Sequence, residues 1–238
     1  AMTFDPPLIE GVLLRRYKRF LADVQLPDGS IITAHTPNTG SMLGCCDPGS
    51  RVWLRDTGSA TRKYPHTWEL VETLNGVPVG INTSIVNTLV IEAIGQRFAG
   101  DLSAYRTIRQ EVRYGQENSR IDLLLTDGPG GRDCYVEIKN VTARDDAGFA
   151  MFPDAVSVRG TKHLRELAAM VAVGHRAVIF FCVQRGDVHT VRPADEIDPA
   201  YGRALREALA SGVEALACAA TVGPQGVVLD RPLPVVCP

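Results

Sequence analysis

Residues 119–142, SRIDLLLTDGPGGRDCYVEIKNVT, constrain the fold of this 238-residue chain more than any other stretch. Two apolar, strand-forming runs flank a glycine-rich turn, which predicts an antiparallel hairpin within a larger sheet. Alternate residues of a strand point to the same face, so Glu137 and Lys139 project together while Ile138 faces away. A hairpin brings Asp122, on the first run, beside this pair. The stretch therefore predicts two carboxylates and one ammonium group at a single sheet surface.

The carboxylate of Asp122 interrupts an otherwise apolar strand. A charge in such a place is paired, has a raised pKa, or is bound to a metal ion. The carboxylates of Asp122 and Glu137 suit a hard divalent cation. The ammonium group of Lys139 suits a phosphate or a metal-bound water.

The composition is that of an ordinary globular protein. Apolar residues make up 45% of the chain and charged residues 22%, which argues against disorder. The net charge of −2 provides no overall basic field, so any contact with nucleic acid depends on local patches. The length predicts one large domain or two modest ones.

Cysteine and hydropathy patterns bear on the compartment. None of the six cysteines forms a CxxC pair, and no histidine pair has zinc spacing, so a zinc site is not expected. No run approaches the roughly 20 apolar residues of a membrane span, and the first residues do not have the pattern of a leader. We therefore expect a cytoplasmic protein with reduced thiols and no membrane partner.

Residues 1–81 predict an all-β domain. Short strand-like runs alternate with turn signals such as Pro27-Asp28-Gly29 and Asn75-Gly76. Five short strands between residues 9 and 81 favour an OB-like barrel, with an SH3-like barrel as the alternative.

Two segments of this domain are candidate nucleic-acid contacts. The predicted first strand carries residues Arg15 to Phe20, which combine charges that follow phosphates with rings that stack on bases; a solvated strand edge is the alternative. The loop at 35–44 has side chains and backbone N–H groups suited to an anion; a tight turn without a ligand is the alternative. The predicted contacts in these segments are Arg15, Arg16, Tyr17, Lys18, Arg19, His35 and Asn38.

Residues 82–238 predict an α/β domain with a mixed central sheet flanked by helices. After Asn82, apolar residues recur at helical spacing and predict a helix. This helix contains Glu92, and a single glutamate on a helix is usually exposed to solvent. Three strands then form a meander, and residues 143–160 predict a long loop. A helix is expected from Thr161, followed by a buried strand at 177–184, an amphipathic helix, and two short final strands.

Three basic residues gather at the start of the helix that is expected from Thr161. They are Arg159, Lys162 and His163. A helix N-terminus attracts anions through its free N–H groups and its dipole. A phosphate site is therefore predicted there, whereas His163 alone would be a surface histidine.

The order of these features resembles the core of the PD-(D/E)xK phosphodiesterases, which occurs in restriction and repair nucleases. The matching elements are a helix with Glu92, a strand with Asp122, a strand with Glu137 and Lys139, and a helix with a basic start. The resemblance implies Asp122, Glu137 and Lys139 as catalytic residues. It also implies Mg²⁺ or Mn²⁺ held by Asp122 and Glu137, with Glu92 completing the set. The first motif here is Ile-Asp instead of Pro-Asp.

Nearly the whole chain is similar to the sugar fermentation stimulation protein A family. The segments HTPNTGSM, RIDLLL, YVEIKNVT and FPDAVSVRGTKHL carry the resemblance in this order. It implies an OB-like domain fused to a nuclease-fold domain, DNA binding, and a regulatory role in sugar (maltose) metabolism. His35, Pro37, Asn38 and Gly40 match the family's HxPNxG pattern, whereas Ser41 replaces its usual basic residue.

Two functions follow as hypotheses. The first is a DNA-binding protein that regulates sugar metabolism, and the second is a Mg²⁺- or Mn²⁺-dependent nuclease that cleaves DNA or RNA. The intact acidic pair with Lys139 favours the nuclease, because carboxylates beside phosphates would weaken a pure binder. Besides DNA or RNA, a second copy of the chain is a candidate partner, in a homodimer.

Overall fold

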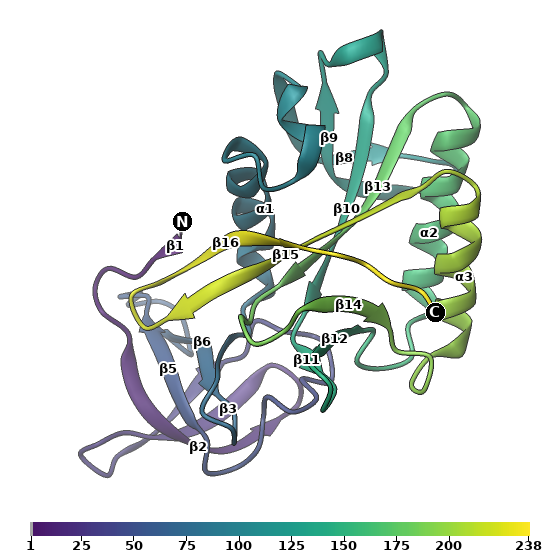
Figure 1. Cartoon of the computed structure of the whole chain (residues 1–238). Helices are drawn as coiled ribbons and strands as arrows, with labels where there is room; N and C mark the ends of the chain where they lie inside the picture. Colours follow the sequence, from purple (N-terminus) through teal and green to yellow (C-terminus); the bar gives the residue numbers. More distant parts are fainter. Residues whose placement is uncertain (1) are drawn as a thin grey trace.

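The computed structural model describes residues 2–238. The N-terminal part is a small β-barrel, as the turn spacing predicted. Its strands follow the order β4-β3-β2-β5-β6-β7, and a parallel bridge between His35 and Thr67 joins β4 to β6. This bridge closes five strands into the OB-like barrel at the lower left of Figure 1. The strands are β2 (Ile9–Tyr17), β3 (Leu21–Gln25), β4 (Ile31–His35), β5 (Arg51–Asp56), β6 (His66–Glu72) and β7 (Pro78–Gly80).

The prediction of one strand carrying Arg15 to Phe20 is wrong. β2 ends at Tyr17, and Lys18 and Arg19 have φ values of 50° and 61°. This left-handed backbone makes the tight turn into β3. Positive φ is uncommon for residues of these types, so local propensity did not indicate the turn.

A short helical segment follows the barrel. It consists of η1 (Thr83–Ile85) and α1 (Val86–Gly95), and η2 (Gly100–Ala104) comes after them. The side chain of Asn82 accepts a hydrogen bond from the N–H of Ser84 at 2.8 Å, which is the capping role that its residue type favours. The helix predicted after Asn82 is therefore present.

The second part is built on a seven-stranded mixed sheet with the order β1-β16-β15-β13-β10-β9-β8. The predicted meander is the antiparallel set β8, β9 and β10, and β13 pairs in parallel with β10 and β15. β1, from the start of the chain, pairs with β16 and so lies in this sheet and not in the barrel. The strands are β1 (Met2–Thr3), β8 (Thr107–Tyr114), β9 (Ser119–Thr126), β10 (Cys134–Val141), β13 (Arg176–Val183), β15 (Glu214–Gly223) and β16 (Gly226–Leu233); η3 (Pro129–Gly131) joins β9 to β10.

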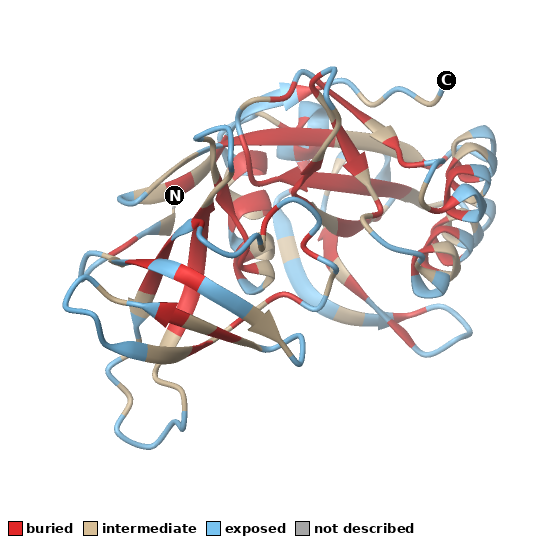
Figure 2. Cartoon of the chain, turned by 90° about the horizontal axis from the view of Figure 1, so that it is seen from below, coloured by how far each residue is buried: buried red, intermediate tan, exposed pale blue. Residues whose placement is uncertain are grey.

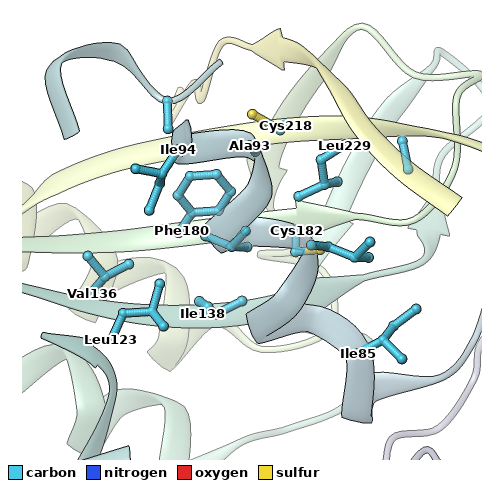
Figure 3. Close-up of a cluster of buried hydrophobic side chains, with 14 of the residues drawn as sticks. Ile85, Ala93, Ile94, Leu123, Val136, Ile138, Phe180, Cys182, Cys218 and Leu229 are labelled. Atoms are coloured by element: carbon cyan, nitrogen blue, oxygen red, sulfur yellow. The ribbon is translucent and has the colours of Figure 1, made fainter. Parts of the chain in front are cut away.

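Helices cover the two faces of this sheet. α1 packs on one face, where Figure 3 shows Ile94 close to Phe180 and Val136. α2 (Val158–Ala172) and α3 (Pro199–Ala210) pack on the other face, and Figure 2 shows them buried on one side only. The helix that was expected from Thr161 begins three residues earlier, because Ser157 caps it by accepting from the N–H of Gly160 at 2.9 Å.

The prediction of an unstructured loop at residues 143–160 is also wrong. β11 (Ala143–Arg144), β12 (Phe149–Phe152) and β14 (Thr190–Pro193) form a separate three-stranded sheet. β12 pairs in parallel with β14, some forty residues further along the chain, and a pairing of that range leaves no local pattern.

Barrel and sheet share a hydrophobic core. Trp53 and Leu70 from the barrel strands belong to the same buried cluster as Leu89 of α1 and Phe180 of β13. Trp68 lies fully inside the barrel, where its indole N–H donates to the carbonyl of Leu70 at 2.8 Å. The two parts are thus packed against each other, and the domain boundary predicted at residue 81 lies between β7 and η1.

All six cysteines lie within residues 2–238 and are free thiols. Within the same residues, no helix has both the length and the apolar character needed to cross a membrane.

Candidate active site

Asp122, Glu137 and Lys139 come together where β9 and β10 separate. The two strands pair from Leu125 to Leu123, opposite Cys134 to Val136, and the ladder stops there. Beyond this point a side chain replaces the backbone partner: Oδ2 of Asp122 accepts a hydrogen bond from the N–H of Ile138 at 2.6 Å. The hairpin that the sequence predicted therefore places the aspartate against the Glu-Ile-Lys segment.

The alternation along β10 also agrees with the prediction. Ile138 faces the core under α1. Glu137 and Lys139 face α2, where both meet His163. The distance from Lys139 Nζ to Glu137 Oε1 is 3.4 Å, that from His163 Nδ1 to the same oxygen is 3.0 Å, and that from Lys139 Nζ to His163 Nδ1 is 2.7 Å.

Glu137 is the most constrained acid of the site, with 5% of its surface exposed. Its Oε1 interacts with both basic neighbours, Lys139 and His163. Its Oε2 is buried and has no hydrogen-bond partner among the described residues. An unsatisfied buried carboxylate oxygen is costly, so it marks a position that suits a bound cation or donor.

The two carboxylates have opposite pKa shifts. Burial, followed by the charge of Glu137, raises the pKa of Asp122 to about 7, although the hydrogen bond from Ile138 acts in the opposite direction. Burial on its own raises the pKa of Glu137, but the hydrogen bond from His163 and the charge of Lys139 outweigh it, so this pKa lies below its usual value. Two acids that crowd one site behave in this way when no cation separates them.

The acidic pair opens into a cavity of about 430 Å³ beneath the start of α2. Arg159, Lys162 and His163 line the cavity together with Asp122 and Glu137, so the basic helix start that was predicted to bind phosphate faces the carboxylates. Arg159 is exposed, and Lys162 Nζ donates to the carbonyl of Glu117 at 3.2 Å. His163 is buried instead of lying on the surface as a lone histidine would.

Glu92 is not among the residues that line this cavity. It belongs to α1, which covers the opposite face of the sheet. Glu111 lines the cavity instead, and its charge helps to raise the pKa of Asp122. Within residues 2–238, no three histidine, cysteine or acidic side chains are grouped closely enough to hold a metal ion as they stand.

Sequence reasoning missed Glu111, which lies opposite Asp122 in the sheet. Gln110 pairs with Leu123 and Val112 pairs with Ile121, so one residue remains between these pairs on each strand, Glu111 on β8 and Asp122 on β9. The φ of 55° at Glu111 is unusual for a strand residue. The register that brings the two acids together does not follow from the local pattern of TIRQEVRY.

The barrel residues predicted to contact nucleic acid occupy different environments. Arg15 pairs with Asp23 at 2.9 Å and lies over the ring of Tyr17, whose hydroxyl also donates to Asp23. Arg16 donates to the carbonyls of Asn38 and Gly40 at 2.8 and 2.9 Å. Arg15 is thus neutralised locally, whereas Arg16 holds the loop at 35–44. Lys18 and Arg19 are exposed in the turn after β2.

The loop at 35–44 is held from within. Asn38 is buried, donates to the carbonyl of Ile81 at 2.9 Å and accepts from the N–H of Gly40 at 2.9 Å. His35 is half-buried, and burial followed by the charge of Arg62 lowers its pKa. The amide of Asn38 therefore positions the loop.

The fold and the placement of the acidic pair define a class. The chain is an OB-like barrel joined to a PD-(D/E)xK nuclease-like domain with the Asp and the Glu-x-Lys segment on neighbouring strands. Residues 14–81 match the model of the SfsA N-terminal OB domain, and residues 84–226 match that of the sugar fermentation stimulation protein RE domain. The chain belongs to the sugar fermentation stimulation protein family.

Individual relatives agree over their full length. A sugar fermentation stimulation protein homolog of Thioalkalivibrio sulfidiphilus is 62% identical over 234 residues, which cover 98% of each chain. One of Alkalilimnicola ehrlichii is 55% identical over 238 residues, covering all of both chains. The solved structure of Pyrococcus furiosus SfsA in complex with Ca²⁺ is similar with a TM-score of 0.87 and 29% identity, over 99% of this chain and 100% of that one.

Proposed function

We propose that the chain is a nuclease that depends on Mg²⁺ or Mn²⁺ and cleaves DNA or RNA. The observation that carries this proposal is the buried Oε2 of Glu137, which has no partner among the described residues and belongs to a side chain that lines a cavity together with Asp122. The raised pKa of Asp122 points the same way, because a divalent cation between the two acids would remove their repulsion.

The donor set fits such a cation. Asp122 and Glu137 supply the carboxylate oxygens that Mg²⁺ and Mn²⁺ prefer, with Glu111 lining the same cavity. The Ca²⁺ in the Pyrococcus furiosus structure supports a divalent site in a relative of the same fold. A metal bound there polarises a phosphate and makes a bound water more acidic.

The remaining side chains have roles that follow from their positions. Lys139 shares a face with Glu137, so its ammonium group can neutralise charge that develops on a phosphoryl oxygen. His163 contacts both Lys139 and Glu137 and fixes their orientation. Arg159 and Lys162 stand at the cavity wall, where cationic groups hold the phosphates of a substrate strand.

The direct test compares the parent chain with a Lys139→Ala variant. Single- and double-stranded DNA and RNA are incubated with Mg²⁺, with Mn²⁺, or with a chelator. We expect metal-dependent cleavage by the parent and a rate at least about 100-fold lower in the variant, because a preorganised charge at the reacting group is lost. Absence of cleavage of every substrate by the parent, with binding retained, would exclude the nuclease.

The second candidate is a DNA-binding protein that regulates sugar (maltose) metabolism without cleavage. The names of the relatives and the exposed basic groups Lys18, Arg19 and Arg159 favour it. With a net charge of −2, such a protein depends on these local contacts.

Binding of DNA through the start of α2 predicts a change in salt dependence. Replacing Arg159 and Lys162 together by alanine removes two phosphate contacts. The slope of log affinity against log salt for duplex DNA should therefore become about two units shallower. Fluorescence anisotropy at several salt concentrations measures this slope. Arg203→Ala, which removes an exposed charge on α3, should leave the slope unchanged. An unchanged slope in the double variant would place the DNA elsewhere.

A further inference from the structure

A second cavity, of about 440 Å³, lies between the barrel and the segment that leads into α2. β2 contributes Arg16 to its wall, the turn after β2 contributes Arg19, and the loop at 35–44 contributes Gly40. From the other part of the chain come Asn140 of β10 and residues 152–157. Cavities of this size accommodate a small molecule or one unit of a polymer.

The lining combines three kinds of chemistry. Arg16 and Arg19 supply guanidinium groups at one side. Phe152 and Pro153 supply an apolar surface. The ring of Phe152 also packs edge-to-face against the ring of Tyr201, with 5.2 Å between the ring centroids. Asp154 adds a carboxylate. This combination suits a nucleotide, since a guanidinium binds its phosphate, a ring packs on its base, and a carboxylate accepts from N–H groups of the base.

Gly40 lines this cavity next to the carboxylate of Asp154. A Cβ at this position would lie 3.3 Å from each carboxylate oxygen of Asp154 and 3.2 Å from Oδ1 of Asn38. Any larger residue would therefore push against the carboxylate. The glycine leaves Asp154 free to meet a ligand from the cavity side.

The two cavities adjoin along shared elements. Glu137 lines the first and Asn140 lines the second, three residues and about 10 Å apart on β10, although the alternation of the strand points these two side chains to opposite faces of the sheet. On the other side, Ser157 lines the second cavity and Arg159 lines the first. About 10 Å corresponds to three stacked nucleotides of one strand, and to fewer if the strand is extended.

We propose that the second cavity binds one unpaired nucleotide of the strand whose backbone lies at Asp122 and Glu137. The lining offers one aromatic ring and one carboxylate, which are contacts for a single base, and a base that enters the cavity must leave its stack. The chain would accordingly prefer single-stranded or locally opened nucleic acid. The inference rests on the proposed nucleic-acid function, but it concerns binding and not cleavage.

The test uses Asp154→Asn, because base recognition and general electrostatics predict opposite effects. Removing a negative charge strengthens non-specific binding to phosphates, whereas removing the acceptor for base N–H groups weakens specific binding. Affinities for a short single-stranded DNA and for its duplex are measured by anisotropy, in Ca²⁺ and in chelator, with the strand checked for cleavage. We expect Asp154→Asn to bind the single strand about tenfold more weakly and the duplex no more weakly than the parent.

Arg19→Ala and Arg203→Ala complete the comparison. Arg19→Ala should lower the affinity for the single strand about tenfold, whereas Arg203→Ala on α3 should leave this affinity nearly unchanged. A thermal melt of each variant shows that the fold is kept. Unchanged or increased single-strand affinity of Asp154→Asn would overturn the proposal.

A competition arm identifies the source of the nucleotide. Adenosine monophosphate should displace the single strand only at concentrations far above those of the strand. Tighter binding of the mononucleotide than of the strand would overturn the placement of a strand in this cavity. Lack of cleavage in Mg²⁺ and Mn²⁺ together with Asp154-dependent binding would reject the nuclease and retain this inference.

Discussion

Replacing Glu137 by glutamine is expected to remove stabilisation of the protein by Mn²⁺ and to lower metal-dependent cleavage by at least about 10²–10³-fold. The reason is that Oε2 of Glu137 is buried and unpartnered among the described residues, and that Glu137 lines the cavity together with Asp122. An amide keeps the shape of the side chain but removes the charge that a divalent cation requires.

The stabilisation can be measured without any substrate. A ligand at 100 times its dissociation constant stabilises a folded protein by about 2.7 kcal/mol. For a chain of this length, that corresponds to a rise in melting temperature of about 5–10 °C. The parent should show this rise when Mn²⁺ replaces chelator, and the Glu137→Gln variant should not.

Glu207→Gln is the matched control, because it removes an exposed carboxylate on α3. This variant should respond to Mn²⁺ as the parent does. An equal rise in melting temperature for the Glu137 variant and the parent would show that the metal is held somewhere else. Such a result would also remove the main support for the nuclease.

The central hairpin was predictable because its geometry follows from a period of two. The alternation in YVEIKNV fixes Glu137 and Lys139 on one face, and the glycine turn fixes Asp122 as their neighbour. The buried strand that contains Phe180 was equally clear, since a continuous apolar run indicates a strand covered on both faces. These features depend on residues that are close in sequence.

Features that depend on distant packing were not predictable. Helical spacing placed Glu92 on a helix but did not indicate which face of the sheet that helix covers. The pairing of β12 with β14 gave strand structure to a segment whose glycines and prolines indicate a loop. Glu111 reaches the site through the register between β8 and β9, and Lys18 and Arg19 turn the chain through positive φ values that their residue types disfavour.

These corrections also change the view of how nucleic acid would be bound. The predicted basic strand is divided, with Arg15 neutralised by Asp23 and with Arg16 and Arg19 bordering the second cavity. The basic groups on the start of α2 border the first cavity. A strand that passes from one cavity to the other would meet arginines at both ends, which a continuous basic surface on the barrel alone would not provide.

The metal-free protein should lose stability as the pH rises from 5 to 8, and Asp122→Asn should remove much of this loss. Burial and the charge of Glu137 raise the folded-state pKa of Asp122 to about 7, from an ordinary value of 3.8. Between these values the folded chain binds a proton that the unfolded chain has released, so its stability decreases with pH until the folded pKa is passed. A shift of about three units is worth on the order of 2–4 kcal/mol. Glu137 has a lowered pKa and stays ionised across this window.

Urea unfolding in chelator at several pH values measures the effect. Asparagine can still accept from the N–H of Ile138 but cannot ionise, so above pH 7 the variant should be more stable than the parent. Mn²⁺ should reverse this order, because the cation stabilises two carboxylates and gains little from one. Asp146→Asn, at an exposed position between β11 and β12, should follow the pH dependence of the parent. Parallel pH curves for the parent and the Asp122 variant would mean that Asp122 does not carry the proton, and that the repulsion between the two acids is relieved within the chain itself.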